Sequence, residues 1–527
     1  MKKRIAMLLM AAVLTVTVLV ISCSKDEAEM GTGGKTTEKT TLIVGAGGDP
    51  MSWNPDSLPD DNGYPIFQNI FNRLVKLDAS KNIIPDLAES WDISPDGKEI
   101  TFYLHTAEWH DGKPVTADDV KYTFDYIAKK NTYLLYSRLQ IIDEIVVKDS
   151  KTVVFKLKVP DVSLVANLGW YASFVLPKHI FDNGQEWEDN IAAKEKPIGS
   201  GPFKLLKFKQ GESVTLEANK NYFMGAPKVD NVIFTIIPDN ATAVQALVNG
   251  EIDVLENVPA ANNRELLANP QLRLVFNEYP SPMRIIFNMR NEKVKDVNLR
   301  RAIASAINKK EISDKIFDGV QKPEYAMYPQ FIKWVSNTEN VSPQFNIDAA
   351  RKILQDAGYK ADKDGFFVRG LQIEVFEGGG YPDAAKLMQA TLAKAGIELK
   401  VNVSEYNAWS DKVGANRDFI LELQGGFMGP DPAALYSRYG TDESNNWSGY
   451  SNIKFDELCK KGLTVGNKEE RAAIYKEAQK ILAEDLPFIP IVGFASYDAN
   501  SVNFKNLPID GTGKWGWQEY TFTEKVR

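Results

Sequence analysis

Histidine and cysteine, the side chains most often found in catalytic and metal sites, are scarce in this chain of 527 residues. The three histidines are His105, His110 and His179, and none belongs to an H-E-x-x-H zinc motif. The sequence has no C-x-x-C pair and no phosphate-binding loop. Its 70 acidic residues make carboxylate pairs inevitable by chance, so their abundance does not indicate a glycosidase. The residue types therefore give no sign of a catalytic, metal or cofactor site, and a secreted hydrolase is only a remote alternative.

Two glycine-rich segments could be taken for sites of chemistry. Gly45 to Pro50 follows a predicted strand, but a dinucleotide loop needs a glycine where Pro50 stands and a helix directly after it. Ser200 lies between two glycines without the G-x-S-x-G frame of a nucleophile elbow. The first segment is therefore rejected as a nucleotide site, and Ser200 is predicted to lie in a structural turn.

Aromatic side chains are numerous and could form platforms on which a sugar ligand stacks. The chain has 26 Phe, 20 Tyr and 10 Trp, more than a small core needs. Most of them could equally complete the core, so composition does not decide between the two roles. The candidates are Trp409, Phe427, Trp447, Tyr450, Trp515 and Trp517.

Elements that would position such residues are clearest between Leu87 and Lys129. A turn at Ser94–Gly97 separates two predicted strands, and Thr116 with Asp119 forms a capping box that begins a helix. Later in the chain, helices alternate with strands, which predicts right-handed βαβ units in a parallel or mixed sheet. In the predicted helix 297–307, Arg300 and Arg301 are expected on a solvated face, and a role in clamping a ligand is the alternative.

Composition sets the general class of the protein. With 44% hydrophobic and 25% charged residues, the chain is expected to be soluble and long enough for two or more domains. Its net charge of −8 and its isoelectric point near 5.3 argue against a nucleic-acid partner.

The N-terminus has the features of a secretory signal. Three basic residues at positions 2–4 precede an uncharged run from Ile5 to Ile21. Cys23 follows directly after a small residue, in a pattern that resembles a bacterial lipobox, where the cysteine is lipid-modified and becomes the first mature residue. A single transmembrane anchor is the alternative. The prediction is a lipid-anchored protein of the bacterial cell envelope, facing the periplasm or the exterior, in which Cys459 is a buried, inert thiol.

An ordered series of motifs between Ala88 and Val120 is the strongest signal in the chain. It reads A-E-S-W, S-P-D-G, T-F-x-L and W-H-D-G-K-P-V-T-A-D-D-V. Further motifs are G-S-G-P-F at 199–203, G-E-x-D at 250–253 and D-x-P-x-I-P at 485–490. Together they resemble the extracellular solute-binding proteins of family 5, the peptide, oligopeptide and nickel-binding group that hands ligands to ABC importers. The resemblance covers nearly all of residues 41–527.

The resemblance implies an α/β fold of the periplasmic-binding-protein type (class II, cluster C), with two domains, an extra inserted lobe and hinge bending. It implies a small peptide as ligand, with an oligosaccharide as the alternative, and the scarcity of histidine makes a nickel complex the least expected. Implied partners are the permease subunits of an ABC importer and, through the lipid, the membrane; the receptor itself is expected to be a monomer. The expected parts are a signal peptide at 1–22, a flexible tether at 23–40, a domain I core lobe at 41–65 with 198–282 and 492–527, an inserted lobe at 66–197, and domain II at 283–491.

Positions for ligand-binding residues also follow from the resemblance. The family's first strand ends in a loop on the cleft wall, and Trp53 in this loop is a cleft candidate, with packing inside a lobe as the alternative. The predicted ligand-binding set is Trp53, Trp409, Phe427, Asp431, Trp447 and Tyr450.

Asp431 is the most specific of these predictions. Peptide receptors of the family share an aromatic residue followed closely by an Asp that binds the α-ammonium group of the ligand. Here Phe427 stands in place of the usual Trp, Pro430 occupies the expected Asp position, and Asp431 comes one step later. Because Asp431 precedes Pro432, it also has the features of a helix N-cap followed by an N1 proline. Both readings stay open.

Overall fold

The computed structural model describes residues 39–56, 60–78, 82–426, 428–429, 431–507 and 519–526. The predictions for the signal peptide, Cys23, Phe427, Trp515 and Trp517 therefore lie outside the described residues. From Lys39 onward the chain forms one compact unit. Within the part that the structure describes, no helix is both long and apolar enough to cross a membrane.

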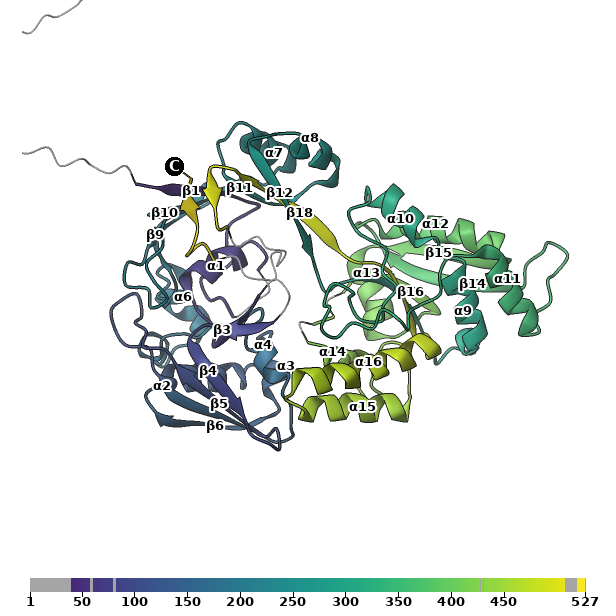
Figure 1. The fold of residues 1–527 in the computed structure, drawn as a ribbon, viewed down its shortest axis with the longest axis horizontal. Coiled ribbons are helices and arrows are strands. Elements are labelled where there is room, and N and C mark those ends of the chain that lie inside the picture. The colour runs from purple at the N-terminus through teal and green to yellow at the C-terminus, as the bar shows by residue number, and fades with distance from the viewer. Residues whose placement is uncertain are drawn as a thin grey trace, which may run out of the picture. The chain divides into compact units, whose positions relative to one another are not determined.

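A seven-stranded sheet in the order β12-β18-β11-β1-β10-β9-β8 forms the base of the N-terminal half (Figure 1). Strand β1 lies at its centre and pairs in parallel with β10 and β11, whereas the outer pairs are antiparallel. Strand β18, which comes last in the sequence among the strands of this sheet, lies between β11 and β12. The strands are β1 Thr41–Ala46, β8 Phe203–Lys209, β9 Ser213–Ala218, β10 Asn231–Ile236, β11 Val254–Val258, β12 Leu272–Glu278 and β18 Ala495–Ser501.

A four-stranded antiparallel sheet in the order β4-β5-β7-β6 carries the motif-rich segment. Its strands are β4 Ala88–Ile93, β5 Glu99–Leu104, β6 Ile142–Asp149 and β7 Thr152–Leu157, and helix α2 (Ala117–Ile127) packs against β6 and β7. The predicted strand, turn, strand and helix are confirmed. So is the capping box, since the N–H of Thr116 donates to Asp119 at 2.8 Å.

A five-stranded mixed sheet in the order β15-β14-β16-β13-β17 forms the third layer. Strand β14 is parallel to β15 and β16, and helix α12 connects β14 to β15 and packs on both, as the predicted βαβ pattern requires. The strands are β13 Met283–Phe287, β14 Val368–Phe376, β15 Ile397–Ser404, β16 Leu421–Gln424 and β17 Phe488–Val492. The helices around this sheet include α9 Val297–Ser305, α10 Lys309–Ile316, α11 Ile347–Asp356, α12 Tyr381–Lys394, α15 Ile453–Thr464 and α16 Lys468–Asp485.

The remaining elements are short, and several of them matter below because they carry cavity residues. They are α1 Tyr64–Ile70, β2 Val75–Leu77, β3 Ile83–Pro85, α3 Tyr136–Leu139, α4 Leu164–Asn167, α5 Lys178–Phe181, α6 Ile191–Lys194, α7 Asn240–Val248, α8 Asn263–Leu267, α13 Tyr406–Trp409, α14 Ala434–Tyr439, β19 Phe504–Lys505 and β20 Glu524–Lys525. The 3₁₀ turns are Trp187–Asp189, Ala260–Asn262 and Glu292–Val294, and a π-helical turn spans Ser410–Ala415.

The described residues pack around two large hydrophobic cores. One joins the seven-stranded and four-stranded sheets, and the other lies around the five-stranded sheet. We call the parts built on them lobe I and lobe II. The chain passes between the lobes at residues 279–282 and again at 493–494, where the N–H of Tyr279 donates to the carbonyl of Phe494 at 2.9 Å. The predicted domain boundaries stay a prediction, and all five strands of lobe II fall between residues 283 and 492.

Two of the sequence motifs meet inside lobe I. The ring of His110 in the W-H-D-G turn lies between residues of the G-S-G-P-F turn: Nε2 is 3.0 Å from the carbonyl oxygen of Gly201, and Nδ1 accepts from the N–H of Gly199 at 3.3 Å. The hydroxyl of Ser200 donates to buried Asn72 at 3.0 Å. A Cβ at Gly199 would lie 1.8 Å from the carbonyl oxygen of Ile70, so only glycine fits there. The prediction that Ser200 lies in a structural turn is confirmed.

Candidate ligand-binding cavity

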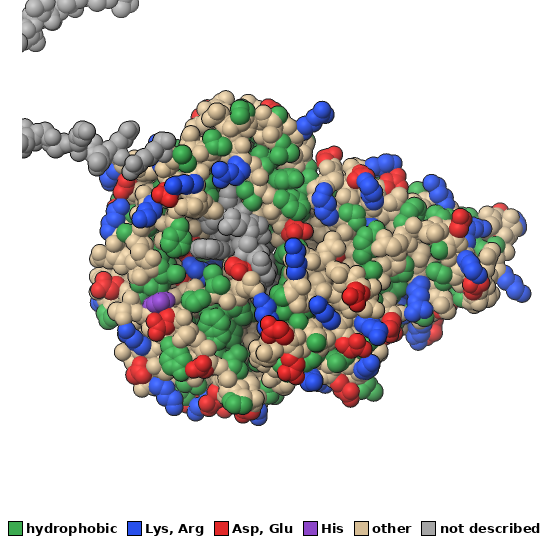
Figure 2. Space-filling view, viewed as in Figure 1, with side chains coloured by type: hydrophobic (Ala, Val, Ile, Leu, Met, Phe, Trp, Pro, Cys, Tyr) green, Lys and Arg blue, Asp and Glu red, His purple; other side chains and the backbone are tan. Residues whose placement is uncertain are grey.

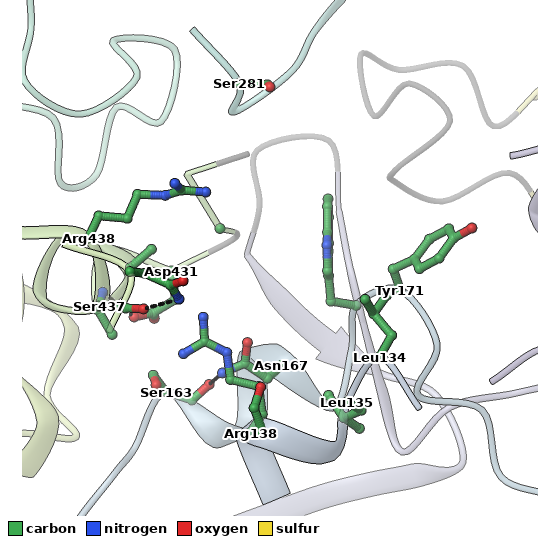
Figure 3. A pocket seen from close by; sticks show the side chains of 16 residues that line it. Leu134, Leu135, Arg138, Ser163, Asn167, Tyr171, Ser281, Asp431, Ser437 and Arg438 are labelled. Atoms are coloured by element: carbon green, nitrogen blue, oxygen red, sulfur yellow. Dashed lines mark hydrogen bonds between the residues drawn. The ribbon is translucent and has the colours of Figure 1, made fainter. Parts of the chain in front are cut away.

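A cavity of about 560 Å³ lies where the two lobes face each other (Figure 3). Its lobe I wall comes from α3, α4 and the segments beside them, and its lobe II wall from α14 and the loops around it. Ser281 joins them from the first crossing between the lobes. The lining residues are Leu134, Leu135, Ser137, Arg138, Ser163, Asn167, Trp170, Tyr171, Ser281, Gly429, Asp431, Ala433, Ala434, Ser437, Arg438 and Asn445.

The lobe I wall is held by a buried arginine behind it. Arg73 donates from Nε to the carbonyl of Trp170 at 2.8 Å and from a terminal nitrogen to the hydroxyl of Tyr64 at 2.6 Å. The ring of Tyr64 in turn stacks on Tyr171, with ring centroids 4.2 Å apart. Burial of these groups in one hydrogen-bonded network fixes the two aromatic lining residues. On α4, Asn167 donates to the carbonyl of Ser163 at 3.0 Å, one helical turn back.

On the lobe II wall, Asp431 is engaged in a buried ion pair. Its two carboxylate oxygens accept from the two terminal nitrogens of Arg471 at 2.5 and 2.6 Å, and both residues are only 7% exposed. Arg471 also donates from Nε to the carbonyl of Gly462 at 2.8 Å. Burial acts to lower the pKa of the Arg471 guanidinium, but the adjacent carboxylate of Asp431 outweighs it and raises that pKa. The guanidinium of Arg471 is therefore charged at neutral pH.

Asp431 also holds the turn that leads into α14, but the N-cap of this helix is Ala433 and not Asp431 as one of the two readings predicted. Its carboxylate accepts from the N–H of Ala433 at 2.9 Å, just before α14. Three hydrogen bonds thus already reach this carboxylate, which has about four acceptor positions. Asp431 does line the cavity, but it is not the unpaired carboxylate that the sequence suggests. Its role toward an α-ammonium group stays a prediction.

Four aromatic residues of the predicted binding set fall in the part of the chain that the structure describes, and they lie outside the cavity lining. Trp53 is 3% exposed and packs edge-on against Phe208 in the core of lobe I, with centroids 5.4 Å apart. Trp409 and Tyr450, also 3% exposed, belong to the core of lobe II. All three lie inside the lobes and outside the lining of this cavity, and their role toward a ligand stays a prediction.

Trp447 is half-buried at the edge of the lobe II core. Its ring lies under the guanidinium of Arg417, 4.6 Å from the ring centroid, and beside Trp409. This arrangement is a cation–π contact that completes the surface of the lobe. Of the six predicted residues, the structure thus places Asp431 in the cavity, four elsewhere, and Phe427 lies outside the described residues.

Residues that sequence reasoning missed are Trp170, Tyr171, Arg138 and Arg438. Trp170 and Tyr171 stand in an apolar run that is indistinguishable from core by pattern. The two arginines stand in short helices of four and six residues. Helices this short show no periodicity from which an inward face could be deduced. These four residues can be recognised as cavity residues only from the tertiary structure, in which the two lobes face each other.

Positive charge dominates around the two cavity arginines. Burial lowers the pKa of Arg438 to about 9, with further lowering by the positive charges of Arg284 and Arg138. Arg284 is fully buried and donates to the carbonyl of Gly426 at 2.8 Å. Glu422, also fully buried, has its pKa raised to about 8 by burial, so much of it is neutral at physiological pH. On the outer surface, by contrast, acidic and basic side chains are interspersed over the visible face (Figure 2).

Three further observations come from comparison with known proteins. Residues 82–446 match the model of the bacterial extracellular solute-binding proteins, family 5. The chain is 30% identical over 516 residues to the oligopeptide-binding protein AppA of Bacillus subtilis, covering 93% of each chain, and 26% identical over 529 residues to heme-binding protein A of Haemophilus influenzae, covering 94% and 95%. Its structure is similar to that of DppA from Helicobacter pylori in complex with the peptide STSA, with a TM-score of 0.73, 26% identity and coverage of 93% and 99%.

Proposed function

This chain belongs to the bacterial extracellular solute-binding proteins of family 5, and from that premise we propose that it captures a peptide between its two lobes and delivers it to the permease of an ABC importer. The fold is that of the periplasmic binding proteins of this family, a mixed α/β architecture with several lobes. In this proposal the protein binds its ligand and releases it unchanged.

The position of the cavity is the observation that carries the proposal. It lies between two separately packed lobes, and its volume of about 560 Å³ falls in the usual range for small-molecule sites. Within the described residues, the chain crosses between the lobes at two neighbouring points, 279–282 and 493–494. Two short crossings side by side are the arrangement that allows lobes to close by bending.

The lining favours a peptide as the ligand. Hydroxyl and amide side chains from both walls offer hydrogen bonds to a peptide main chain, and Leu135, Trp170 and Tyr171 offer apolar surface to side chains. A relative also binds a peptide: the structure of the oligopeptide-binding protein AppA from Bacillus subtilis is a complex with a nonapeptide. A sugar ligand has less support, because Trp409, Trp447 and Tyr450 lie outside the cavity lining.

Closure around the ligand would couple binding to delivery. A ligand that contacts both walls stabilises the closed form relative to the open form and shifts the population toward it. The permease would then recognise the closed form. Attachment to the membrane through lipid on Cys23, after removal of residues 1–22, would keep the receptor close to that permease.

Isothermal calorimetry with mixtures of short peptides and with oligosaccharides tests the proposal. We expect heat of binding from a peptide pool, none from cello-, manno- or xylo-oligosaccharides, and recovery of the bound peptides intact by mass spectrometry. Binding only by an oligosaccharide would assign a different ligand class, and cleaved peptides would indicate an enzyme.

Two tryptophan substitutions show whether the cavity is the binding site. Ser437→Trp places a large ring in the cavity and should abolish peptide binding. Ser150→Trp adds the same ring at an exposed turn between β6 and β7 and should leave binding unchanged. Equal binding by both variants would place the peptide site elsewhere.

A further inference from the structure

The two lobes also touch at a place other than the chain crossings. Segment 160–163 of lobe I runs along the end of α15 in lobe II, where the N–H of Val162 donates to the carbonyl of Leu463 at 2.9 Å. In the turn between β4 and β5, a Cβ at Gly97 would lie 3.6 Å from the carbonyl oxygen of Thr464. Figure 1 shows α15 and α16 beside α3 of lobe I. We call the contact of residues 97 and 160–163 with residues 463–464 the latch, and it exists only while the lobes are together.

Asp161 in the latch is half-buried beside charged groups of lobe II. Its carboxylate accepts from the N–H of Ser163 at 2.9 Å and from the hydroxyl of the same residue at 2.6 Å. Asp431, Arg471 and Tyr475 of lobe II are the titratable groups that interact with it electrostatically. Ser163 and Asp431 line the cavity from its two walls, so the latch borders the ligand site (Figure 3).

These lobe II groups do not fully compensate the charge of Asp161. Arg471 binds both carboxylate oxygens of Asp431 with its two terminal nitrogens, so one guanidinium serves two carboxylates. Burial raises the pKa of the Tyr475 hydroxyl well above its ordinary value, so this residue is neutral and adds no charge. Closed lobes with an ionised Asp161 therefore contain one negative charge in excess in this group, in a medium that screens it poorly.

The cost of that charge arises when the lobes close. In the latch, burial raises the pKa of Asp161 above its ordinary 3.8, and the hydrogen bonds from Ser163 oppose the rise. The charge of Asp431 adds to the rise in pKa, and that of Arg471 opposes it. When the lobes separate, water replaces lobe II around Asp161 and its pKa returns toward the ordinary value. Between these two pKa values the closed form binds a proton that the open form does not, so closure becomes more favourable as the pH decreases.

We propose that Asp161 takes up a proton when the lobes close, so that the latch couples ligand capture to the acidity of the surroundings. The inference deepens the proposed function, on which it rests, because it names what regulates closure of the same cavity. Asp161 acts without touching the ligand. Its protonation stabilises the closed form relative to the open form, and a ligand that contacts both walls gains affinity from that shift.

Calorimetry between pH 5 and pH 7.5 tests the coupling. The probes are tri-, tetra- and penta-alanine, which have no titrating side chain and whose termini titrate equally for every variant. We expect the affinity of wild type to increase about threefold or more from pH 7.5 to pH 5. Asp161→Asn keeps an acceptor for Ser163 but does not titrate. It should bind more tightly than wild type at pH 7.5, and its affinity should change less with pH.

The matched control is Asp143→Asn, which removes the same charge from an exposed position on β6 of lobe I and should keep the wild-type pH dependence. Asp161→Ala takes the place of Asp161→Asn if circular dichroism shows that the latter is not folded. Calorimetry at pH 5.5 in two buffers of different ionisation enthalpy counts the protons directly. Wild type should take up more protons per bound peptide than Asp161→Asn.

Small-angle scattering of the ligand-free protein tests the latch without any peptide. At pH 7.5 the Asp161→Asn protein should have a smaller radius of gyration than wild type, because more of it is closed. Lowering the pH to 5 should decrease the radius of gyration of wild type and leave that of Asp161→Asn unchanged.

The outcomes separate this inference from the proposed function. Peptides that bind with the same pH dependence and proton uptake in wild type and in Asp161→Asn leave the peptide receptor standing and overturn the role of Asp161. If no peptide binds, the proposed function fails and scattering decides. Equal radii of gyration for the two ligand-free proteins at pH 7.5 then overturn the role of Asp161 as well, and a smaller radius in Asp161→Asn supports it for a ligand of another class.

Discussion

Asp431 illustrates how a single residue can satisfy a structural role and a cavity position together. Its pairing with Arg471 joins the loop before α14 to helix α16, two segments that the sequence places far apart. Removing one member of a buried ion pair leaves the other charge buried without compensation, which typically costs about 3–5 kcal/mol. A lost helix cap costs only ~1 kcal/mol.

We therefore expect Asp431→Asn to destabilise the ligand-free protein. The sequence suggests this substitution as a clean test of ligand binding, since Asn caps a helix nearly as well as Asp. The ion pair with Arg471 changes that expectation. The free energy of unfolding, measured with urea in the absence of ligand, should fall by about 3 kcal/mol or more.

The double variant Asp431→Asn with Arg471→Met is the control, since it removes the uncompensated charge and should recover part of the loss. An Asp431→Asn protein that keeps its ligand-free stability but binds peptides at least tenfold more weakly would contradict this account. That result would support the reading in which Asp431 binds the α-ammonium group.

The sequence pattern predicts the environment of Cys459 correctly and that of Arg300 wrongly. Cys459 is buried as predicted, and burial raises the pKa of its thiol. Arg300 was expected on a solvated face but is only 3% exposed. Its guanidinium donates to the carbonyls of Asp485 and Leu486, where α16 ends, at 2.6 to 3.1 Å. The last carbonyl groups of a helix have no hydrogen-bond partner within that helix, so they can accept hydrogen bonds from a buried charged side chain. The sequence pattern around Arg300 does not show that the end of α16 lies beside it.

At the scale of elements, the contact of His110 with the G-S-G-P-F turn makes lobe I sensitive to acid. Burial lowers the pKa of His110 to about 4 from its ordinary 6.5, because the ring is held neutral, with Nδ1 accepting a hydrogen bond. Between pH 6.5 and pH 4 the unfolded chain binds a proton that the folded chain does not. Stability should therefore fall as the pH decreases through this window, by roughly 3 kcal/mol at most.

The measurement is the free energy of unfolding at pH 7 and pH 4.5 for wild type and for His110→Gln. The glutamine amide does not titrate, so the variant should lose less stability on acidification than wild type. His105→Gln, at a partly exposed histidine of the same lobe, should keep the wild-type dependence. If the His110→Gln protein loses as much free energy of unfolding between pH 7 and pH 4.5 as wild type does, His110 does not cause the loss.

Elements with strong local signals were predictable, and contacts between distant segments were not. The capping box at Thr116 and the turn at Ser94–Gly97 follow from neighbouring residues, so the sequence predicts them well. At the start of α7, Asp239 and Asn240 are both residue types that cap helices, and the cap is Asp239, whose carboxylate accepts from the N–H of Thr242 at 2.8 Å. The cavity depends on which faces of α3 and α14 meet across the lobes, which is a tertiary property.

For the whole molecule, the prediction concerns its attachment. Residues 1–22 and Cys23 lie outside the described residues, and the proposal for them rests on the sequence pattern. We expect wild-type protein to fractionate with membranes and Cys23→Ala protein to be released, because stable anchoring requires acyl chains on this cysteine.

Cys459→Ala is the matched control, since it removes the other cysteine of the chain and should leave the protein with the membranes. A Cys23→Ala protein that stays in the membrane and retains residues 1–22 by mass spectrometry would identify the segment as a transmembrane anchor instead.

The place of β18 in the seven-stranded sheet has a consequence for the order of events during synthesis. Strands β1, β10, β11 and β12 leave the ribosome before any part of lobe II, yet β12 pairs in this sheet only with β18, which follows lobe II. Until then the nascent sheet has an unpaired edge, which is prone to wrong pairing. Lobe II, whose five strands are contiguous in the chain, needs no later segment and can finish first. The lobe that begins the polypeptide is therefore the last to be completed.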